Sequence, residues 1–359
     1  MWKQISWNNT YTRIYRISFM PYFFTPTELS SMPFKNVRNV EVLEDFPIHN
    51  TGKSDNNLKN NHHSKATSRY GSEWVALDET PSFLQDSLEK LQMALDNLDS
   101  NSKKVFDQAK VKCPEQCQEH FFLKHLRAEK FQIRAAALRI VRYWQERLTL
   151  FQQDCFKPME PYGTLDHSAI QWLRSSLYQI IGKDDVGRPI LLYRYRWMPQ
   201  TAQDWNEHRI SILKAHWYIM EKVTEDVTAQ RYGFIFFGNS RGLVLGHYDK
   251  EFQTLSNKHL KTCLPVRVPA GHLCQCPLIM KMMIKIMKPM LNKVSKSRLI
   301  LHDGKTKEII YSLKSTYSIP NDCLLEIFDL PLCTDVDRIT SLESQVDGIG
   351  GLLDTLVHV

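Results

Sequence analysis

The chain has 359 residues, of which 43% are apolar and 24% are charged, and its formal net charge is +7. This composition is typical of a globular protein and excludes wholesale disorder, collagen and coiled coil. The length suggests two domains with tails, and the sequence has no run of about 18 apolar residues that would predict a membrane span. Eight cysteines are too few for a disulfide scaffold, which favours reduced thiols in a cytosol-like compartment.

Residues 1–72 are predicted to form an N-terminal tail and a disordered linker. The first 40 residues are basic and acid-poor, which is typical of a cleavable organelle presequence, but they are crowded with aromatic residues and show no amphipathic helix. Targeting and an adaptor tail that contacts a protein partner therefore both stay open. Residues 47–72 are rich in Asn and Ser and cannot bury enough apolar surface to offset their chain entropy.

Residues 80–151 are predicted to form a small all-α domain. Thr80 followed by Pro81 is typical of a helix start, because the hydroxyl caps the first turn and proline fits it. Leucines at spacings of three and four then predict an amphipathic helix. Three further helical segments follow at 103–112, 115–128 and 132–151.

Residues 165–335 are predicted to form an α/β domain with a mostly parallel sheet, because strands alternate with helices. A tail at 336–359 follows. The predicted helices are 165–181, 205–227, 248–261 and 277–292. The predicted strands are 190–197, 232–237, 271–276 and 298–302, with 321–328 as a candidate further strand.

Basic residues are concentrated in one part of the chain. From Phe252 to His302 there is no Asp or Glu, whereas nine Lys or Arg residues occur there. Such a local charge attracts anionic lipid, nucleic acid or an acidic protein. A solvated basic face is the simpler interpretation of the same run.

The segment Pro277–Lys296 combines this charge with an apolar stripe. Lysines at spacings of four and three are typical of a helix that lies at an anionic membrane surface, and methionines repack readily around varied apolar shapes. An amphipathic helix packed on its own sheet has the same pattern. The apolar face comprises Leu278, Ile279, Met282, Met283, Ile286, Met287, Met290 and Leu291, and the lysines are Lys281, Lys285 and Lys288.

Motifs of catalysis and of nucleotide binding are absent from the sequence. It contains no P-loop, no G-x-G-x-x-G after a strand and no G-x-S-x-G elbow, and no nucleophile, base and orienting group can be assembled. His272, Cys274 and Cys276 are spaced as H-x-C-x-C, and Cys113 and Cys117 as C-x-x-x-C, but both sets are too small for tetrahedral zinc. The sequence therefore predicts no enzyme, no resident metal and no cofactor.

Three segments in this order resemble the CRAL-TRIO lipid-binding and lipid-transfer family. FLKHLRAEKFQIRAAALRIVRYWQER at 122–147 is similar to its paired helices, and DDVGRPILLY at 184–193 is similar to its D-x-x-G-R-P strand start. Pro277–Lys296 stands where the family has its mobile gate helix. The resemblance spans about residues 80–335 and includes the N-terminal helical unit.

The resemblance implies a non-enzymatic carrier that holds one hydrophobic molecule between the sheet and a helical gate. The protein would be cytoplasmic and peripheral on anionic membranes, would not bind nucleic acid, and would exchange lipid when the gate opens. The implied pocket walls are Tyr193, Tyr195, Phe234 and Phe236, and the implied gate residues are Leu278, Met282, Met283, Ile286, Met287 and Met290. The implied headgroup or membrane contacts are Lys130, Lys281, Lys285, Lys288 and Arg298.

The sequence departs from the branch of the family that handles phosphatidylinositol. That branch has L-R-A-R-K where this chain has Glu129 before Lys130, and an acid there repels a phosphate. Phe234 and Phe236 replace small hydroxyl residues. The expected cargo is another phospholipid, a sterol, a tocopherol-like isoprenoid or a carotenoid-like pigment. The alternative function is a lipid-regulated scaffold or signalling adaptor without net lipid transport.

Overall fold

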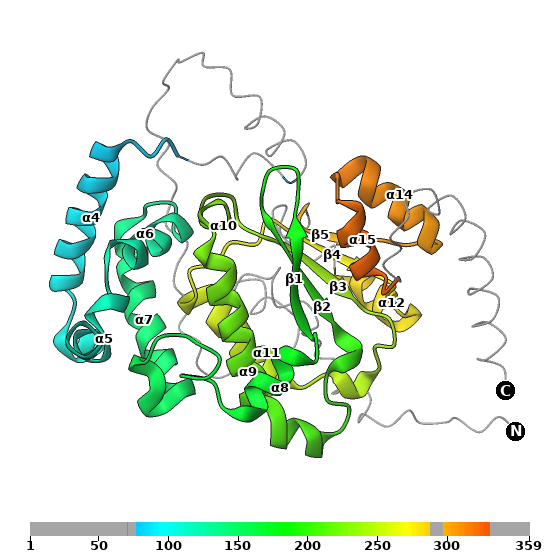
Figure 1. Ribbon diagram of the computed structural model, residues 1–359, viewed down its shortest axis with the longest axis horizontal. Helices are drawn as coiled ribbons and strands as arrows, with labels where there is room; N and C mark the ends of the chain where they lie inside the picture. The colour runs from blue at the N-terminus through cyan, green and yellow to red at the C-terminus, as the bar shows by residue number, and fades with distance from the viewer. Residues whose placement is uncertain (1–69, 71–76, 288–296, 331–359) are drawn as a thin grey trace, which may run out of the picture.

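A five-stranded sheet lies at the centre of the described part of the chain. The computed structural model describes residues 70, 77–287 and 297–330 (Figure 1). Within these residues the sheet has the order β1-β2-β3-β4-β5, with β1 antiparallel to β2 and all other neighbours parallel. This confirms the predicted α/β fold. The strands are Tyr178–Lys183, Pro189–Arg194, Ile235–Asn239, Ala270–Cys274 and Leu299–Leu301.

The described part of the chain has four α-helices between Pro81 and Phe151, where the sequence predicted a helical unit. As predicted, the Thr80 hydroxyl accepts from the Phe83 amide at 3.2 Å, with Pro81 in the first turn. Asp99 caps the second helix in the same way through the Ser102 amide. The helices are α4 (Pro81–Asp96), α5 (Ser100–Lys112), α6 (Glu119–Ala128) and α7 (Ile133–Phe151).

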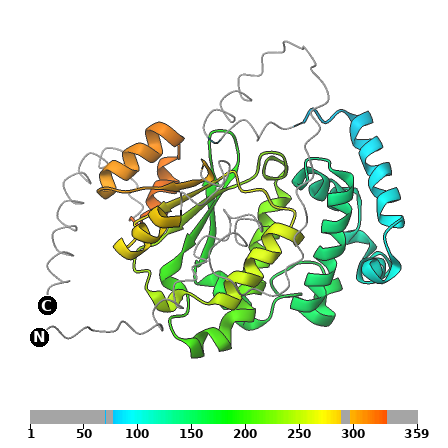
Figure 2. The same cartoon turned by 180° about the vertical axis from the view of Figure 1, so that it is seen from behind.

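The remaining helices cover the two faces of the sheet. Figures 1 and 2 show α9 and α11 on the side toward the helical unit, and α14 and α15 on the opposite side. These helices are α8 (His167–Arg174), α9 (Ala202–Glu225), α10 (Val227–Tyr232), α11 (Lys250–Lys258), α12 (Leu278–Met287), α14 (Thr306–Tyr317) and α15 (Asn321–Ile327). A π-helical turn, His259–Cys263, extends α11.

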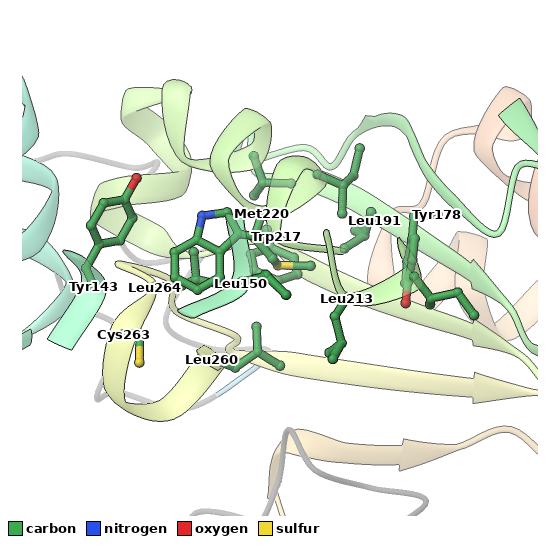
Figure 3. Packing of buried hydrophobic residues seen from close by; sticks show 14 of the residues in the cluster. Tyr143, Leu150, Tyr178, Leu191, Leu213, Trp217, Met220, Leu260, Cys263 and Leu264 are labelled. Carbon is green, nitrogen blue, oxygen red and sulfur yellow. The ribbon is translucent and has the colours of Figure 1, made fainter. Parts of the chain in front are cut away.

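One hydrophobic cluster joins the helical unit to the sheet. Figure 3 shows Trp217 and Leu213 of α9 between Tyr143 of α7 and the strand residues Tyr178 and Leu191. All five side chains are buried. The helical unit and the sheet therefore share a core rather than touching only at a polar surface.

A second cluster fills the opposite face of the sheet. Ile190 and Ile235 pack there with Leu313 of α14 and Leu324 of α15. Tyr70 also belongs to this cluster and is almost fully buried, although the sequence predicted a disordered linker over 47–72. At this residue the prediction is wrong, because an aromatic ring in a polar tract finds apolar partners in the sheet. The rest of the predicted linker lies outside the described residues.

Two predicted elements are wrong. The helix expected over 165–181 ends at Arg174, and Tyr178 begins β1, which pairs with β2. The candidate strand at 321–328 is helix α15, because Cys323, Leu324 and Ile327 recur at helical rather than alternating spacing on its buried side. The predicted C-terminal tail at 336–359 and, apart from Tyr70, the predicted tail and linker at 1–72 lie outside the described residues.

Candidate functional site

The sheet face toward α9 carries a row of aromatic side chains. Because Leu191 pairs with Phe236 and Tyr193 pairs with Gly238, alternate residues of β2 and β3 point to this face. The ring of Tyr193 stacks on that of Tyr178 with centroids 4.8 Å apart, and it contacts Tyr195 at 4.4 Å and Phe236 at 6.1 Å. These rings form a continuous apolar floor.

All four residues predicted to line a pocket lie in this region. Tyr193, Tyr195, Phe234 and Phe236 are buried in the cluster that also contains α9 and α12. The structure therefore brings them together, and their contact with a ligand stays a prediction. Tyr178 belongs to the same row and was missed, because the sequence predicted a helix where β1 begins.

A few polar groups lie among these apolar side chains. His216 of α9 is fully buried, its ring lies 5.3 Å from that of Tyr178, and its Nδ1 lies 3.4 Å from the Ser256 hydroxyl of α11. Burial lowers the pKa of His216 to about 3, so the imidazole is neutral at physiological pH. The Tyr193 hydroxyl donates to the Met198 sulfur at 2.7 Å. Such groups can orient a mostly apolar ligand without adding charge.

Helix α12 divides its apolar residues between the core and solvent. Met280 and Ile284 are buried in the cluster of the aromatic row, whereas Leu278 is 74% exposed and Met282 is 52% exposed. The predicted apolar face is therefore wrong in part, because it left out Met280 and Ile284. These two residues lie four positions apart and form the buried side of the helix. The side chains of Ile279, Met283, Ile286 and Met287 are not described. Lys288, Met290 and Leu291 lie outside the described residues.

Several residues of the basic run serve the fold. Lys258 pairs with Glu146 of α7, and Lys281 pairs with Asp303 at 2.5 Å. Arg267 is buried and donates to the Arg231 carbonyl at 2.7 Å. These contacts reduce the free basic charge that the sequence indicated.

Two of the predicted contact residues retain exposed surface near α12. Lys285 is exposed on the helix, and Arg298 before β5 is half-buried. Lys281 is half-buried and its charge is balanced by Asp303. Contact of these residues with a headgroup stays a prediction.

The departure at Glu129 has a structural explanation. Glu129 forms an ion pair with Arg139 of α7, and Arg139 donates to the carbonyls of Lys261 and Leu264 at 2.7 Å each. The acid thus holds an arginine that fastens the helical unit to the π-helical turn after α11. Lys130 is exposed in the turn between α6 and α7, with φ of 51°.

The D-x-x-G-R-P segment forms the hairpin between β1 and β2. The Asp184 carboxylate accepts from the Arg188 amide at 2.9 Å and from its Nε at 2.8 Å, and both side chains are buried. Gly187 has φ of +88°, a conformation that a side chain disfavours. The motif therefore fixes the start of β2, which carries Tyr193.

Two kinds of feature are absent from the described residues, a membrane-spanning helix and a cluster of metal ligands. None of the helices there is long and apolar enough to cross a bilayer. No three His, Cys, Asp or Glu side chains there are grouped so that they could hold a metal ion. His272 instead contacts His302 at 2.8 Å and the Tyr70 hydroxyl at 3.1 Å on the α14 side of the sheet.

Comparison with known families decides the identity of this sheet domain. The CRAL/TRIO domain matches residues 173–328, from the end of α8 to the residue after α15. This chain contains a CRAL/TRIO domain. The match covers every strand of the sheet, the aromatic row and α12, and it confirms the resemblance found in the sequence. CRAL/TRIO domains bind lipids, and the chain is accordingly a lipid-binding protein.

A solved structure is also similar to this chain. The crystal structure of Sfh5 covers 72% of this chain and 98% of its own, with 11% sequence identity and a TM-score of 0.39. The helical unit at 80–151 precedes the matched CRAL/TRIO domain, and its boundaries stay a prediction.

Proposed function

We propose that the CRAL/TRIO domain holds a single hydrophobic lipid against the aromatic row and exchanges it at membranes through movement of α12. The observation that carries this proposal is the division of α12. Met280 and Ile284 reach the cluster that contains Tyr193, while Leu278 and Met282 face solvent. A helix with apolar residues on both sides can leave the sheet and still bury apolar surface, provided that a bilayer receives it.

The chemistry of the site favours an apolar cargo. The aromatic row offers ring surface and few polar groups, and shielding apolar ligand surface contributes roughly 25 cal/mol per Å² removed from water. Glu129 forms an ion pair with Arg139, so this position offers no positive charge that could bind a phosphate. A sterol, an isoprenoid or a phospholipid other than phosphatidylinositol therefore fits this site better than phosphatidylinositol.

The same proposal covers the setting in which the protein works. It acts as a carrier rather than an enzyme, needs no cofactor beyond its lipid and does not bind nucleic acid. It is cytoplasmic and binds anionic membranes peripherally, with Lys281 and Lys285 at the headgroups and with an N-terminal tail free for a protein partner or for organelle targeting. Lys285 is exposed on α12 and can attract anionic lipid at about 1 kcal/mol for each basic residue near the surface.

A transfer assay with two matched variants tests this proposal. Leu278 in α12 and Tyr311 in α14 are each 74% exposed, so aspartate at either position leaves the core intact. Leu278→Asp should slow lipid movement between donor and acceptor vesicles by about tenfold, because a charge opposes insertion of α12, whereas Tyr311→Asp should transfer as the wild type does.

The opposite results would favour other functions. Equal lipid transfer by both variants would show that insertion of α12 is not needed for lipid exchange. No transfer by any form, together with stable recovery of a protein partner, would favour the scaffold. Rapid transfer of phosphatidylinositol would refute the choice of cargo.

A further inference from the structure

Exposed apolar side chains gather where the parallel strands end. Arg194, Asn239 and Cys274 are neighbours in the register of β2, β3 and β4, so the chain leaves all three strands at one edge of the sheet. We name the exposed apolar residues that follow these strand ends the carboxyl edge. It consists of Trp197 (46% exposed), Val244 (50%), Leu245 (55%), Leu278 and Met282.

The loop after β3 is built so that its two apolar residues point outward. Leu243 and His247 are buried on either side of Val244 and Leu245. The His247 Nδ1 accepts from the Val244 amide at 3.0 Å, and Leu245–His247 forms a single 3-10 turn. Because its flanks are fixed, this turn presents Val244 and Leu245 to solvent in a defined position.

The same loop is fastened to the segment that follows β2. The Trp205 indole donates to the Gly246 carbonyl at 3.1 Å. A Cβ at Gly246 would lie 2.0 Å from the Gln200 carbonyl oxygen, so only glycine allows this approach. A Cβ at Gly242 would lie in ordinary van der Waals contact, 3.6 Å from the Cβ of Arg196, which precedes Trp197. Trp197 and the loop thus belong to one surface.

The loop is also joined to the start of α12. The Ser240 amide donates to the Cys274 carbonyl at 3.0 Å, and the Cys276 thiol lies 3.5 Å from the Ser240 hydroxyl. Leu278 follows two residues later. The carboxyl edge is therefore continuous from Trp197 through the loop to α12.

The charges beside this edge favour an anionic surface. Arg241 is exposed within the loop, and Lys285 is exposed on α12. Two acids follow the loop, and Arg209 pairs with both of them, with Asp249 at 2.8 Å and with Glu251 at 2.9 Å. A tryptophan beside aliphatic residues and free basic groups is typical of protein surfaces that enter the interface of a bilayer.

We propose that residues 241–247 form a second membrane-inserting element, which enters an anionic bilayer through Val244 and Leu245 beside Trp197 and the start of α12. Two inserted elements at the carboxyl ends of the strands would orient the domain with these strand ends toward the bilayer. This inference rests on the membrane docking proposed above, and it adds a contact by a loop to the contact by the gate helix.

Vesicle flotation of the full chain tests this loop. The probe is phosphatidylcholine vesicles with and without phosphatidylserine. The variant Val244→Asp/Leu245→Asp should bind the anionic vesicles about tenfold more weakly than the wild type. The control Met93→Asp/Val111→Asp, at exposed apolar positions of α4 and α5, should bind as the wild type does.

A variant that binds vesicles more tightly than the wild type separates an effect on membrane contact from a loss of folding. Leu245→Trp should increase anionic-vesicle binding several-fold, because tryptophan prefers the bilayer interface. Wild-type binding by both loop variants would overturn the inference and leave the carboxyl edge for a protein partner.

Lipid bound after purification is measured in parallel. If the loop variant loses flotation while no form carries a lipid, this inference holds and the carrier function fails. If the purified protein carries a lipid and the loop variant floats as the wild type does, the carrier function holds and this inference fails.

Discussion

Glu221 of α9 is a buried anion that joins the helical unit to the CRAL/TRIO domain. Its carboxylate accepts from Lys124 of α6 at 2.7 Å, and both side chains are largely buried. Burial alone would raise the pKa of Glu221, but the charges of Lys124 and Arg147 outweigh it and lower the pKa to about 2. Lys124→Met would leave this carboxylate in the core without its nearest cation.

The size of the effect follows from the pKa. A fall from 4.5 to about 2 corresponds to roughly 3 kcal/mol of stabilisation of the charged form, at the lower end of the range for breaking a buried ion pair. Lys124→Met should therefore lower the free energy of unfolding by about 3 kcal/mol at pH 7. Because the folded-state pKa is depressed, the stabilisation is present above about pH 4.5 and is lost as the pH falls toward 2.

Urea denaturation at pH 7 measures this change. The exposed pair of Lys90 and Asp86 supplies the control, and Lys90→Met should alter stability by less than about 1 kcal/mol. The double variant Lys124→Met/Glu221→Leu removes both charges and should recover most of the loss. Equal stability of Lys124→Met and Lys90→Met, or no recovery in the double variant, would refute the reasoning.

Three further predictions concern acid stability, α12 and Tyr70. Burial lowers the pKa of His125 to about 3. The contribution of the neutral imidazole to stability should therefore be complete above about pH 6.5 and should be lost as the pH falls toward 3. In a series of urea midpoints measured over this pH range, His125→Phe should show a weaker dependence on pH than the wild type. Asp303→Asn removes the partner of Lys281 and should speed lipid release about twofold in the transfer assay without lowering the thermal midpoint; slower release would contradict the role of this pair in holding α12. Tyr70→Ala should lower the free energy of unfolding by about 3 kcal/mol, because Tyr70 packs on Tyr317 and bonds to His272, and an unchanged urea midpoint would show that Tyr70 does not dock in solution.

The fold could be predicted where sequence periodicity and packing agree. The helix from Pro81 has its cap and its apolar stripe in the sequence, and the buried β2 and β3 strands are continuous apolar runs. β1 was missed because its hydrophobic pattern continues that of α8, and only pairing with β2 makes it a strand. The sequence predicts a strand where α15 forms, because a short apolar segment does not distinguish the period of a strand from that of a helix.

The candidate site could be predicted in its residue types but not in its faces. Tyr193 and Phe236 lie in one row, as strand alternation requires. The apolar residues of α12 extend over most of the helix circumference, so the sequence could not show that Met280 faces the core and Leu278 faces solvent. Nor could the sequence show that Lys281 and Lys258 form ion pairs with Asp303 and Glu146, because those partners lie far away in the sequence.

The central claim is that the domain holds one hydrophobic lipid. Native mass spectrometry of the purified full chain, followed by extraction and identification of the bound molecule, tests it most directly. We expect one sterol, isoprenoid or non-inositol phospholipid for each chain. A mass equal to that of the bare polypeptide, which persists after incubation with mixed-lipid vesicles, would contradict it.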